Sequence, residues 1–289
     1  MFGILLIDKP KGITSHDAVY RVRRRLGIKR VGHLGTLDPM ATGLLVLGIG
    51  SATRFLRYIE AEPKVYTGTM KFGVTTTTQD AEGEVMAERG IQGLAEDAIR
   101  QAASQFVGAI EQIPPMYSAV KIGGERLYKM ARKGIEVERG PRHVTVHKFE
   151  ISKFLPPLVD FEVSCSGGTY VRTLANDLGE RLGAGAHLTA LRRTNIGGFS
   201  VDEACALETA SDADLLPLEQ ALSPLLVIDL DDDLANMALH GESIPATDDG
   251  EGSLAILTYS CAFLAVARRT AGGWHPETVM PRDLTISRG

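Results

Sequence analysis

The order of strand-like and helix-like segments is what most constrains the fold of this chain. Apolar or alternating runs predict strands at 3–7, 44–49, 65–72, 144–149 and 159–164. Apolar residues at helical spacing, with Ser15 and Ser51 as expected N-caps, predict helices at 15–27, 51–59, 94–107 and 170–182. The two kinds of element do not alternate as they would in a doubly wound βαβ fold. The sequence therefore predicts an α+β fold with a mixed, mainly antiparallel sheet and flanking helices.

A change of composition divides the chain into two parts. Residues 200–251 hold fourteen Asp or Glu and no Lys or Arg, which we interpret as a solvated acidic connector. Three short strands predicted at 254–259, 262–268 and 274–280 follow it. A length of 289 residues is enough for one large and one small domain. We expect a large domain over 1–225 and a small β-rich module over 226–289.

The distribution of charge matters more than its total here. The net charge is −5, but residues 1–199 contain 27 Lys or Arg against 20 Asp or Glu. Because the local field sets what a surface binds, a nucleic acid remains an allowed partner. The densest cationic group ends the first predicted helix: Arg21, Arg23, Arg24, Arg25, Lys29 and Arg30. Two interpretations stay open, a helix end favoured by the dipole and a patch that faces phosphates.

Several classes of function find no support in the sequence. No apolar stretch reaches the roughly 20 residues that span a bilayer, so we expect a cytoplasmic protein without a membrane partner. Three widely spaced cysteines form neither a disulfide framework nor a zinc motif. The segment 48–53 has only half of a dinucleotide fingerprint, and no histidine pair has metal-binding spacing. We therefore expect neither a cofactor nor a metal.

Residues 31–43 are punctuated by Gly and Pro and are expected to form a loop. The segment GHLGTLDPMATGLL at 32–45 is the strongest candidate to carry chemistry, because it places Asp38 in this loop just before a buried strand. Pro39 restricts Asp38 to extended backbone, and the flanking glycines permit sharp turns. Such a loop can present one carboxylate rigidly into a cleft. An ordinary Asx turn in an Asp-Pro context is the structural alternative.

Arg172 is the cation we expect beside Asp38. It lies near the start of the helix predicted over 170–182, after a Gly-Gly turn. The helix dipole disfavours a cation at that end, so its position indicates a nearby anion, either a side chain or a phosphate. A cation close to Asp38 would keep its carboxylate ionised inside a cleft.

At this point the loop is recognisable: it resembles the catalytic-aspartate motif of the TruB family of pseudouridine synthases. Further similar segments follow in the family's order over about residues 3–200: DKPKGITS at 8–15, KVY at 64–66, PPMYSAVK at 114–121, GERLY at 124–128, CSGGTYVRTL at 165–174, LRRT at 191–194 and GFS at 198–200. The segment LHGESI at 239–244 weakly resembles the short PUA-like module of bacterial members. The resemblance implies the pseudouridine synthase type of core with a C-terminal PUA-like RNA-binding module.

The resemblance also implies a reaction and roles for single residues. Asp38 would be the nucleophile in the isomerisation of a tRNA T-loop uridine, at position 55, to pseudouridine. The target base would be flipped out of its stack. The residues do not distinguish attack on the sugar from attack on the base. Arg172 would pair with Asp38, and Tyr66 would stack on the base and take part in proton transfer. His33 would support the flipped conformation, and Leu191 would line the uracil pocket. Lys9 and Tyr170 would support the pocket.

RNA contacts are expected on exposed basic residues and on two loops, near 73–83 and 121–142. The residues expected to contact RNA are Arg21, Arg24, Arg25, Lys29, Arg30, Asp80, Lys121, Arg126, Lys129, Arg132 and Arg142. The sequence FGVTTTTQDAEG at 72–83 departs from the family pattern. Thr77 stands where the family usually has Asp, whereas Asp80 is kept. The part of this loop in closing over RNA therefore stays open.

Other functions compete with this interpretation. A non-catalytic RNA-binding or tRNA-folding protein needs only the basic surface and the PUA-like tail, but it leaves the joint occurrence of Asp38, Tyr66 and Arg172 unexplained. A guide-RNA-dependent synthase would carry a longer C-terminal module and basic extensions, so we expect no guide RNA. A glycosidase would need a second carboxylate beside Asp38, which no motif supplies. A monomer is the default expectation.

Overall fold

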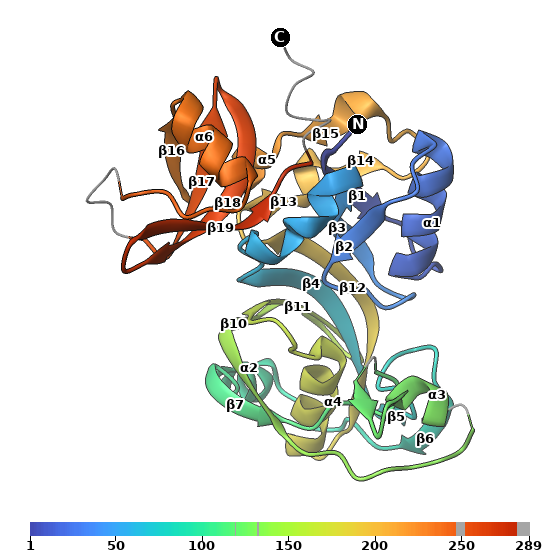
Figure 1. Ribbon diagram of the computed structural model, residues 1–289. Coiled ribbons are helices and arrows are strands. Elements are labelled where there is room, and N and C mark those ends of the chain that lie inside the picture. Colours follow the sequence, from blue (N-terminus) through green and yellow to red (C-terminus); the bar gives the residue numbers. More distant parts are fainter. Residues whose placement is uncertain (119, 132, 247–251, 282–289) are drawn as a thin grey trace.

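Strands from both halves of the chain form one long mixed sheet in the computed structural model, which describes residues 1–118, 120–131, 133–246 and 252–281 (Figure 1). Its strands are β1 (Gly3–Lys9), β2 (Val31–Leu34), β3 (Thr42–Ile49), β4 (Lys64–Phe72), β7 (Gly108–Gln112), β10 (Arg142–Leu155), β11 (Leu158–Cys165), β12 (Ala186–Ile196), β13 (Phe199–Ser200), β14 (Cys205–Ala206) and β15 (Leu215–Leu216). The main path runs β14-β1-β3-β12-β4-β11-β10-β7. Most neighbouring strands are antiparallel, which confirms the predicted mixed, mainly antiparallel α+β fold.

The two halves of this sheet meet at a short parallel contact. Strand β12 pairs with β3 over only two register positions, Arg192 with Thr42 and Arg193 with Gly43. Gly43 has φ +98°, and a Cβ there would lie 2.2 Å from the carbonyl oxygen of Arg193. Only glycine fits this approach. The loop that carries Asp38 ends at this contact, so the junction fixes where the loop lies.

Two helices cover one face of the half formed by β12, β4, β11, β10 and β7. They are α2 (Glu96–Ser104) and α4 (Val171–Arg181), and both lie on the same side of these strands in Figure 1. Their buried apolar residues join those of the sheet in one core cluster. In α4, Val171, Leu174 and Leu178 face inward, as the helical spacing predicts. The packing of α4 against the sheet therefore fixes the position of its first turn, which includes Arg172.

Helix α1 (Ser15–Leu26) packs Val19 and Val22 against the other half of the sheet. Its N-cap is Thr14, not the predicted Ser15: Thr14 and Asp17 form a capping box. Ser15 is buried instead, and its hydroxyl exchanges hydrogen bonds with the backbone of Leu37. The helix ends at Gly27 in a left-handed conformation.

Three other local predictions were wrong or incomplete. Residues 31–34, predicted as part of a loop, form β2 because they pair antiparallel with the exposed edge of β3. The helix predicted at 51–59 is two short 3₁₀ turns, η1 (Gly50–Arg54) and η2 (Leu56–Tyr58). The predicted polar loop 73–83 begins with β5 (Val74–Thr76), which pairs with β6 (Val85–Glu88).

Residues 200–251 are not merely a solvated connector. Strands β14 and β15 pair with β1, and α5 (Leu218–Ala221) buries Leu218 against the same half. The stretch goes on into β16 (Leu226–Leu230) and α6 (Asp232–Leu239). In the described part of this stretch most acidic side chains are exposed, whereas Leu207, Leu218 and Ile228 are among the buried apolar residues. The acidic composition therefore reflects the solvated face of folded structure.

The predicted C-terminal strands form a second sheet. It consists of β16, β17 (Leu254–Tyr259), β18 (Ala262–Thr270) and β19 (Gly273–Val279), with α6 against it. The sheet packs on the large half through Phe263, whose ring meets that of Phe55 edge-on at 4.9 Å. Two smaller elements complete the structure, the hairpin β8 (Lys121–Ile122) and β9 (Glu125–Arg126) and the helix α3 (Leu127–Ala131).

Candidate active site

Asp38 lies in a loop that is held at several points. The Leu37 backbone exchanges hydrogen bonds with the Ser15 hydroxyl. The carbonyl of Pro39 accepts a hydrogen bond from the Gly12 amide, and the carbonyl of Asp38 accepts one from the Ala41 amide. The Asp38 side chain is 39% exposed. The loop therefore presents a partly solvated carboxylate from a backbone with little freedom to move.

The structure places Arg172 beside Asp38. Its Nε lies 2.9 Å from Asp38 Oδ2, while the Arg172 side chain is only 4% exposed. The distance is that of an ion pair, although the N–H of Nε is not aligned as a hydrogen bond. Arg172 is fixed by donating Nη1 to the carbonyl of Thr78 at 2.8 Å and Nη2 to that of Tyr117 at 2.9 Å. A guanidinium held in this way fixes the position of one positive charge next to Asp38.

Asp80 belongs to the same cluster, which the sequence did not predict. We expected it among the RNA contacts, but its side chain is 4% exposed and its Oδ2 lies 3.3 Å from Arg172 Nη1. Its other oxygen accepts hydrogen bonds from the Thr78 hydroxyl and from the Glu82 amide. A buried, fully engaged carboxylate does not reach a ligand in this structure. Asp80 is thus a second anion for Arg172, and the position of Arg172 at a helix N-terminus is explained by two carboxylates.

A cavity of about 280 Å³ opens beside Asp38 and Arg172. Expected site residues that line it are Asp38, Tyr66, Tyr170, Arg172 and Leu191. Tyr66 comes from β4 and Leu191 from β12, and both are more than nine-tenths buried. Burial raises the pKa of the Tyr66 phenol, so this side chain is neutral at neutral pH.

Two expected site residues do not line the cavity. Lys9 is fully buried, and its ammonium donates to the carbonyls of Pro10 at 2.9 Å and Ile13 at 2.8 Å. Burial lowers its pKa to about 8, with Asp38 acting in the opposite direction. His33 lies in β2, and burial lowers its pKa, with His16 adding to the effect. Lys9 thus holds the 10–13 segment, whose Gly12 binds the aspartate loop, and His33 lies outside the cavity.

Arg193 and Lys64 line the cavity but were not assigned a role from the sequence. Arg193 is 1% exposed and donates Nε to the carbonyl of Leu44 at 2.9 Å, Nη2 to that of Gly35 at 3.0 Å and Nη1 to that of Thr36 at 3.4 Å. These bonds hold the aspartate loop at both of its ends. The motif LRRT at 191–194 had marked this place, but the sequence did not show which of its arginines turns inward.

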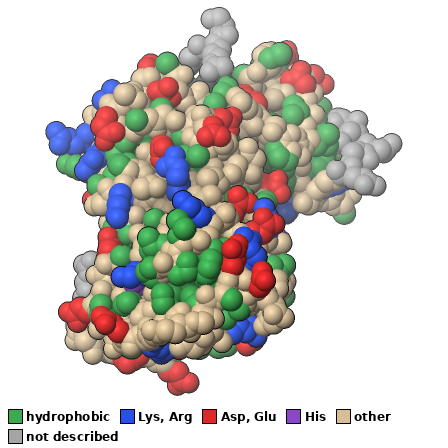
Figure 2. Space-filling view, turned by 180° about the vertical axis from the view of Figure 1, so that it is seen from behind, with side chains coloured by type: hydrophobic (Ala, Val, Ile, Leu, Met, Phe, Trp, Pro, Cys, Tyr) green, Lys and Arg blue, Asp and Glu red, His purple; other side chains and the backbone are tan. Residues whose placement is uncertain are grey.

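The predicted RNA contacts on α1 and after it are exposed: Arg21, Arg24, Arg25, Lys29 and Arg30. Arg25 also donates to the carbonyl of Ala210, and Arg24 lies over the ring of Tyr20. Seen from behind, basic side chains gather at the edge of the upper half, on the side where α1 lies (Figure 2).

Lys121, Lys129 and Arg142 are also exposed. Arg126 is part of β9, and Arg132 lies outside the described residues. The structure thus brings five of the expected site residues together at one cavity, but not Lys9 and His33. The expected RNA contacts are spread over α1, the segment after it and the 121–142 region.

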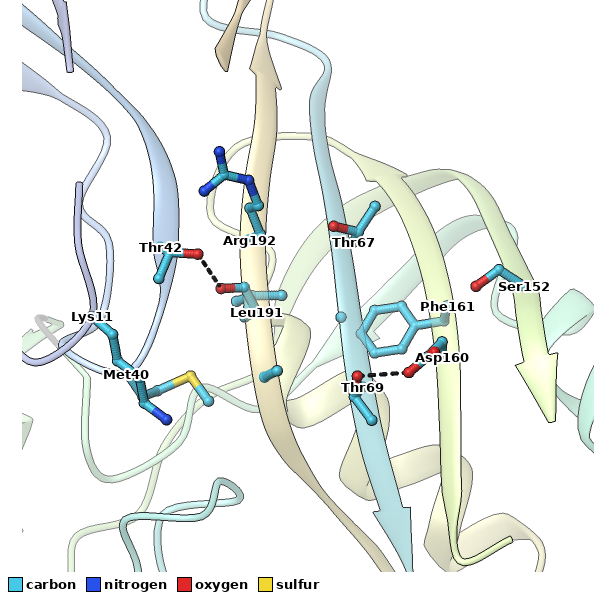
Figure 3. A pocket seen from close by; sticks show the side chains of 12 residues that line it. Lys11, Met40, Thr42, Thr67, Thr69, Ser152, Asp160, Phe161, Leu191 and Arg192 are labelled. Atoms are coloured by element: carbon cyan, nitrogen blue, oxygen red, sulfur yellow. Dashed lines mark hydrogen bonds between the residues drawn. The ribbon is translucent and has the colours of Figure 1, made fainter. Parts of the chain in front are cut away.

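A second, larger cavity of about 390 Å³ lies at the other face of β4 and β12. Thr67, Thr69, Asp160 and Arg192 point into it, and Asp160 accepts a hydrogen bond from Thr69 at 2.6 Å (Figure 3). Arg192 is paired with Asp8 there. This cavity lacks Asp38 and Arg172, so size alone does not locate the chemistry. Within the described residues, no cluster of metal-binding side chains occurs, and no helix is long and apolar enough to cross a membrane.

Comparison with known families identifies the class of enzyme to which this fold and site belong. A family model described as "TruB family pseudouridylate synthase (N terminal domain)" matches residues 23–171, and one described as "tRNA pseudouridylate synthase B C-terminal domain" matches 172–227. The protein is therefore a pseudouridylate synthase, which is an isomerase. The chain belongs to the TruB family.

Curated relatives match from about three quarters of this chain to nearly all of it. A tRNA pseudouridine synthase B of Thermobifida fusca is 43% identical, with 96% of this chain and 98% of that protein covered. One of Opitutus terrae is 50% identical over 77% of this chain and 92% of its own length. Among solved structures, a chain in a Cbf5-Nop10-Gar1 complex superposes with a TM-score of 0.71 at 26% identity, covering 98% of this chain and 86% of that chain.

Proposed function

We propose that this enzyme converts the uridine at position 55, in the T-loop of tRNA, into pseudouridine, with Asp38 as the nucleophile. The observation that carries the proposal is the ion pair of the partly exposed Asp38 with the buried Arg172 at the cavity. The names of the curated relatives, tRNA pseudouridine synthase B, support tRNA as the substrate.

The reaction exchanges one bond of the nucleotide for another. The bond between N1 of uracil and C1′ of ribose breaks, the base turns, and C5 bonds to C1′. The hydrogen on C5 leaves and N1 gains a hydrogen, so no oxidant and no water is consumed. A carboxylate suits this task because it can form an ester-like bond and release it again. Arg172 is the fixed positive partner that aims the Asp38 carboxylate at the nucleotide.

The cavity accommodates one base rather than a duplex. Its volume of about 280 Å³ is slightly below the usual range of ligand sites, about 300 to 1,000 Å³. The target nucleotide must therefore leave its stack, at a cost of a few kcal/mol that is least in a strained loop. In the proposal the uracil lies between the Tyr66 ring and Leu191. Tyr66 stacks as a neutral phenol and serves as a proton donor rather than as a base.

Other residues support this arrangement. Gln112 accepts from the Tyr170 amide at 2.7 Å and donates to its carbonyl at 3.0 Å, which orients Tyr170 at the cavity. Lys9 stabilises the neighbouring loop. In the proposal His33, outside the cavity, contacts the opened base stack of the RNA.

RNA binding is proposed to extend over a wide surface. The exposed basic residues of α1 and of 121–142 contact phosphates, and residues 226–289 form a PUA-like RNA-binding module beside a catalytic domain of residues 1–225. The enzyme works as a monomer on naked tRNA without a guide RNA.

Purified protein and an unmodified tRNA transcript test the proposal. Wild type should release tritium from [5-³H]uridine at position 55 only, and Asp38→Asn should bind the transcript but lose at least about 10³-fold in rate. Asp160→Asn, a matched change of the carboxylate in the second cavity, should leave the rate unaltered. If wild type binds the transcript but modifies no uridine, the proposed function fails for this substrate, and a guide-dependent or purely RNA-binding activity takes its place.

A further inference from the structure

Two cations line the cavity besides Arg172. Lys64 begins β4, and Arg193 lies two strand positions from it across β12, opposite Tyr66. Within the described residues, neither forms an ion pair, whereas Arg172 in the same cavity pairs with two carboxylates. Glu62 is near Lys64, but its Oε1 accepts from the Gly167 amide at 2.7 Å. Two like charges kept close together raise the energy of the empty site. Such an unfavourable arrangement of charges is commonly found at functional sites.

The charge of Arg193 is fixed and cannot itself turn to a ligand. Its three nitrogens all donate to backbone carbonyls of the aspartate loop and of β3. Carbonyls satisfy the hydrogen bonds of a guanidinium, but they do not neutralise its charge. The loop is therefore built around a permanent positive charge. Burial lowers the pKa of the Lys64 ammonium, the charge of Arg193 lowers it further, and Glu62 acts in the opposite direction.

Lys64 is the cation that a ligand can reach. Its side chain is half-buried and makes no hydrogen bond to any described residue. Glycines lie on two sides of the ammonium: a Cβ on Gly35 would be 3.6 Å from Lys64 Nζ, and one on Gly167 would be 3.3 Å away. The absence of a side chain at Gly35 leaves room for another group beside Nζ, whereas on the other side a Cβ of Gly167 would lie 2.8 Å from Glu62 Oε1.

We propose that Lys64, with Arg193 behind it, binds a phosphate next to the target nucleotide. The inference rests on the proposed RNA substrate and adds a subsite to it. A phosphate flanks each nucleotide on both sides, so a base that enters beside Asp38 brings a phosphate to the edge of the cavity. A flexible lysine ammonium is a suitable point charge for a phosphate oxygen. The phosphate would neutralise the two cations when the substrate is bound.

A double-mutant cycle between protein and RNA tests the pairing. T-loop stem-loops carry one neutral methylphosphonate linkage, on the 5′ or the 3′ side of the target nucleotide, and are compared with the same 2′-O-methyl RNA bearing a normal phosphate. Binding is measured in the Asp38→Asn background, so that no turnover interferes. Removing the charge from one partner, by Lys64→Met or by methylphosphonate at one of the two sites, should weaken binding on the order of tenfold. Removing both should cost no more than removing one.

Salt dependence and two control variants make the test specific. Lys64→Met should reduce the slope of log Kd against log salt by about one unit, and Lys64→Arg should restore it. Lys71→Met is the matched control, because Lys71 lies near the other end of the same strand and on its opposite face. Its effect should not couple to either methylphosphonate.

Two results would overturn the inference. One is a cycle in which Lys64→Met and both methylphosphonates act additively. The other is a Lys64→Met protein that binds RNA with unchanged affinity and salt slope but has a lower kcat. That result would show that the Lys64 ammonium acts on the uracil rather than on a phosphate. Because the cycle measures only binding, its outcome does not depend on whether wild type converts the uridine, so failure of the proposed function is seen separately.

Discussion

Replacing Arg172 by Met should damage stability through Asp80 rather than through Asp38. Arg172 is buried and holds two carboxylates and two backbone carbonyls. Without it, Asp38 can be hydrated because its side chain is 39% exposed, but Asp80 is 4% exposed and cannot. Removing one partner of a buried ion pair typically costs about 3–5 kcal/mol, because the other charge is left uncompensated. We expect a loss of this size in the free energy of unfolding.

The reasoning makes a stronger prediction for the double variant. Asp80→Asn alone should destabilise by about 1–3 kcal/mol, since Arg172 keeps Asp38 and both carbonyls. Arg172→Met with Asp80→Asn should be less destabilised than the sum of the two, by at least about 1 kcal/mol, because no charge remains buried alone. The double variant should nevertheless stay inactive, because Asp38 has still lost its cation.

Urea unfolding followed by circular dichroism measures these differences. The slope of free energy against urea should be the same for all four proteins, so that midpoints can be compared. Effects that add within about 0.5 kcal/mol would refute the idea that Asp80 is the orphaned charge. Recovery of activity in the double variant would refute the dependence of Asp38 on Arg172.

Three further perturbations test other parts of the structure. Gly43→Ala should destabilise by roughly 2–4 kcal/mol in urea, because its Cβ would collide with the Arg193 carbonyl at a positive φ; an unchanged midpoint would contradict the tight strand junction. Tyr66→Phe should keep the wild-type pH dependence of kcat from pH 6 to 9, because burial raises the pKa of this phenol; the loss of a limb from that profile would show a phenolate base. For Lys9 the pKa is about 8 when folded, against 10.5 in its ordinary state. The unfolded chain then binds more protons between pH 8 and 10.5, so wild type should gain roughly 1–3 kcal/mol relative to Lys9→Met as pH rises through that window; a constant or falling difference would contradict it.

The sequence predicted what local patterns and long motifs encode. The strands at 44–49 and 65–72 and the helix at 170–182 were confirmed, because apolar spacing over several residues reports which face is buried. The resemblance of 32–45 and 165–174 to family motifs singled out Asp38 and Arg172, which the structure places 2.9 Å apart.

Features that depend on long-range pairing were beyond the sequence. Residues 31–34 become a strand only because β3 offers them an edge, and Ser15 loses the cap position because its hydroxyl is engaged by Leu37, 22 residues away. Asp80 was expected to contact RNA, because the sequence of its loop does not show that Arg172 lies 3.3 Å from its carboxylate. Composition failed at 200–251 for a related reason, since it counts residues without showing which face they occupy.

The charges around the cavity explain how an acidic protein can act on RNA. The charged side chains that line the cavity are one carboxylate, Asp38, and three cations, Arg172, Lys64 and Arg193, in a chain whose net charge is −5. Because Arg172 is paired with Asp38 and Asp80, the positive charge that remains for a ligand is that of Lys64 and Arg193, where the cavity meets the aspartate loop. A polyanion is attracted to that local field and not to the total. Among the described residues, Asp38 forms its ion pair with Arg172 and not with Lys64 or Arg193, so in our proposal a phosphate can be bound without displacing Arg172 from Asp38.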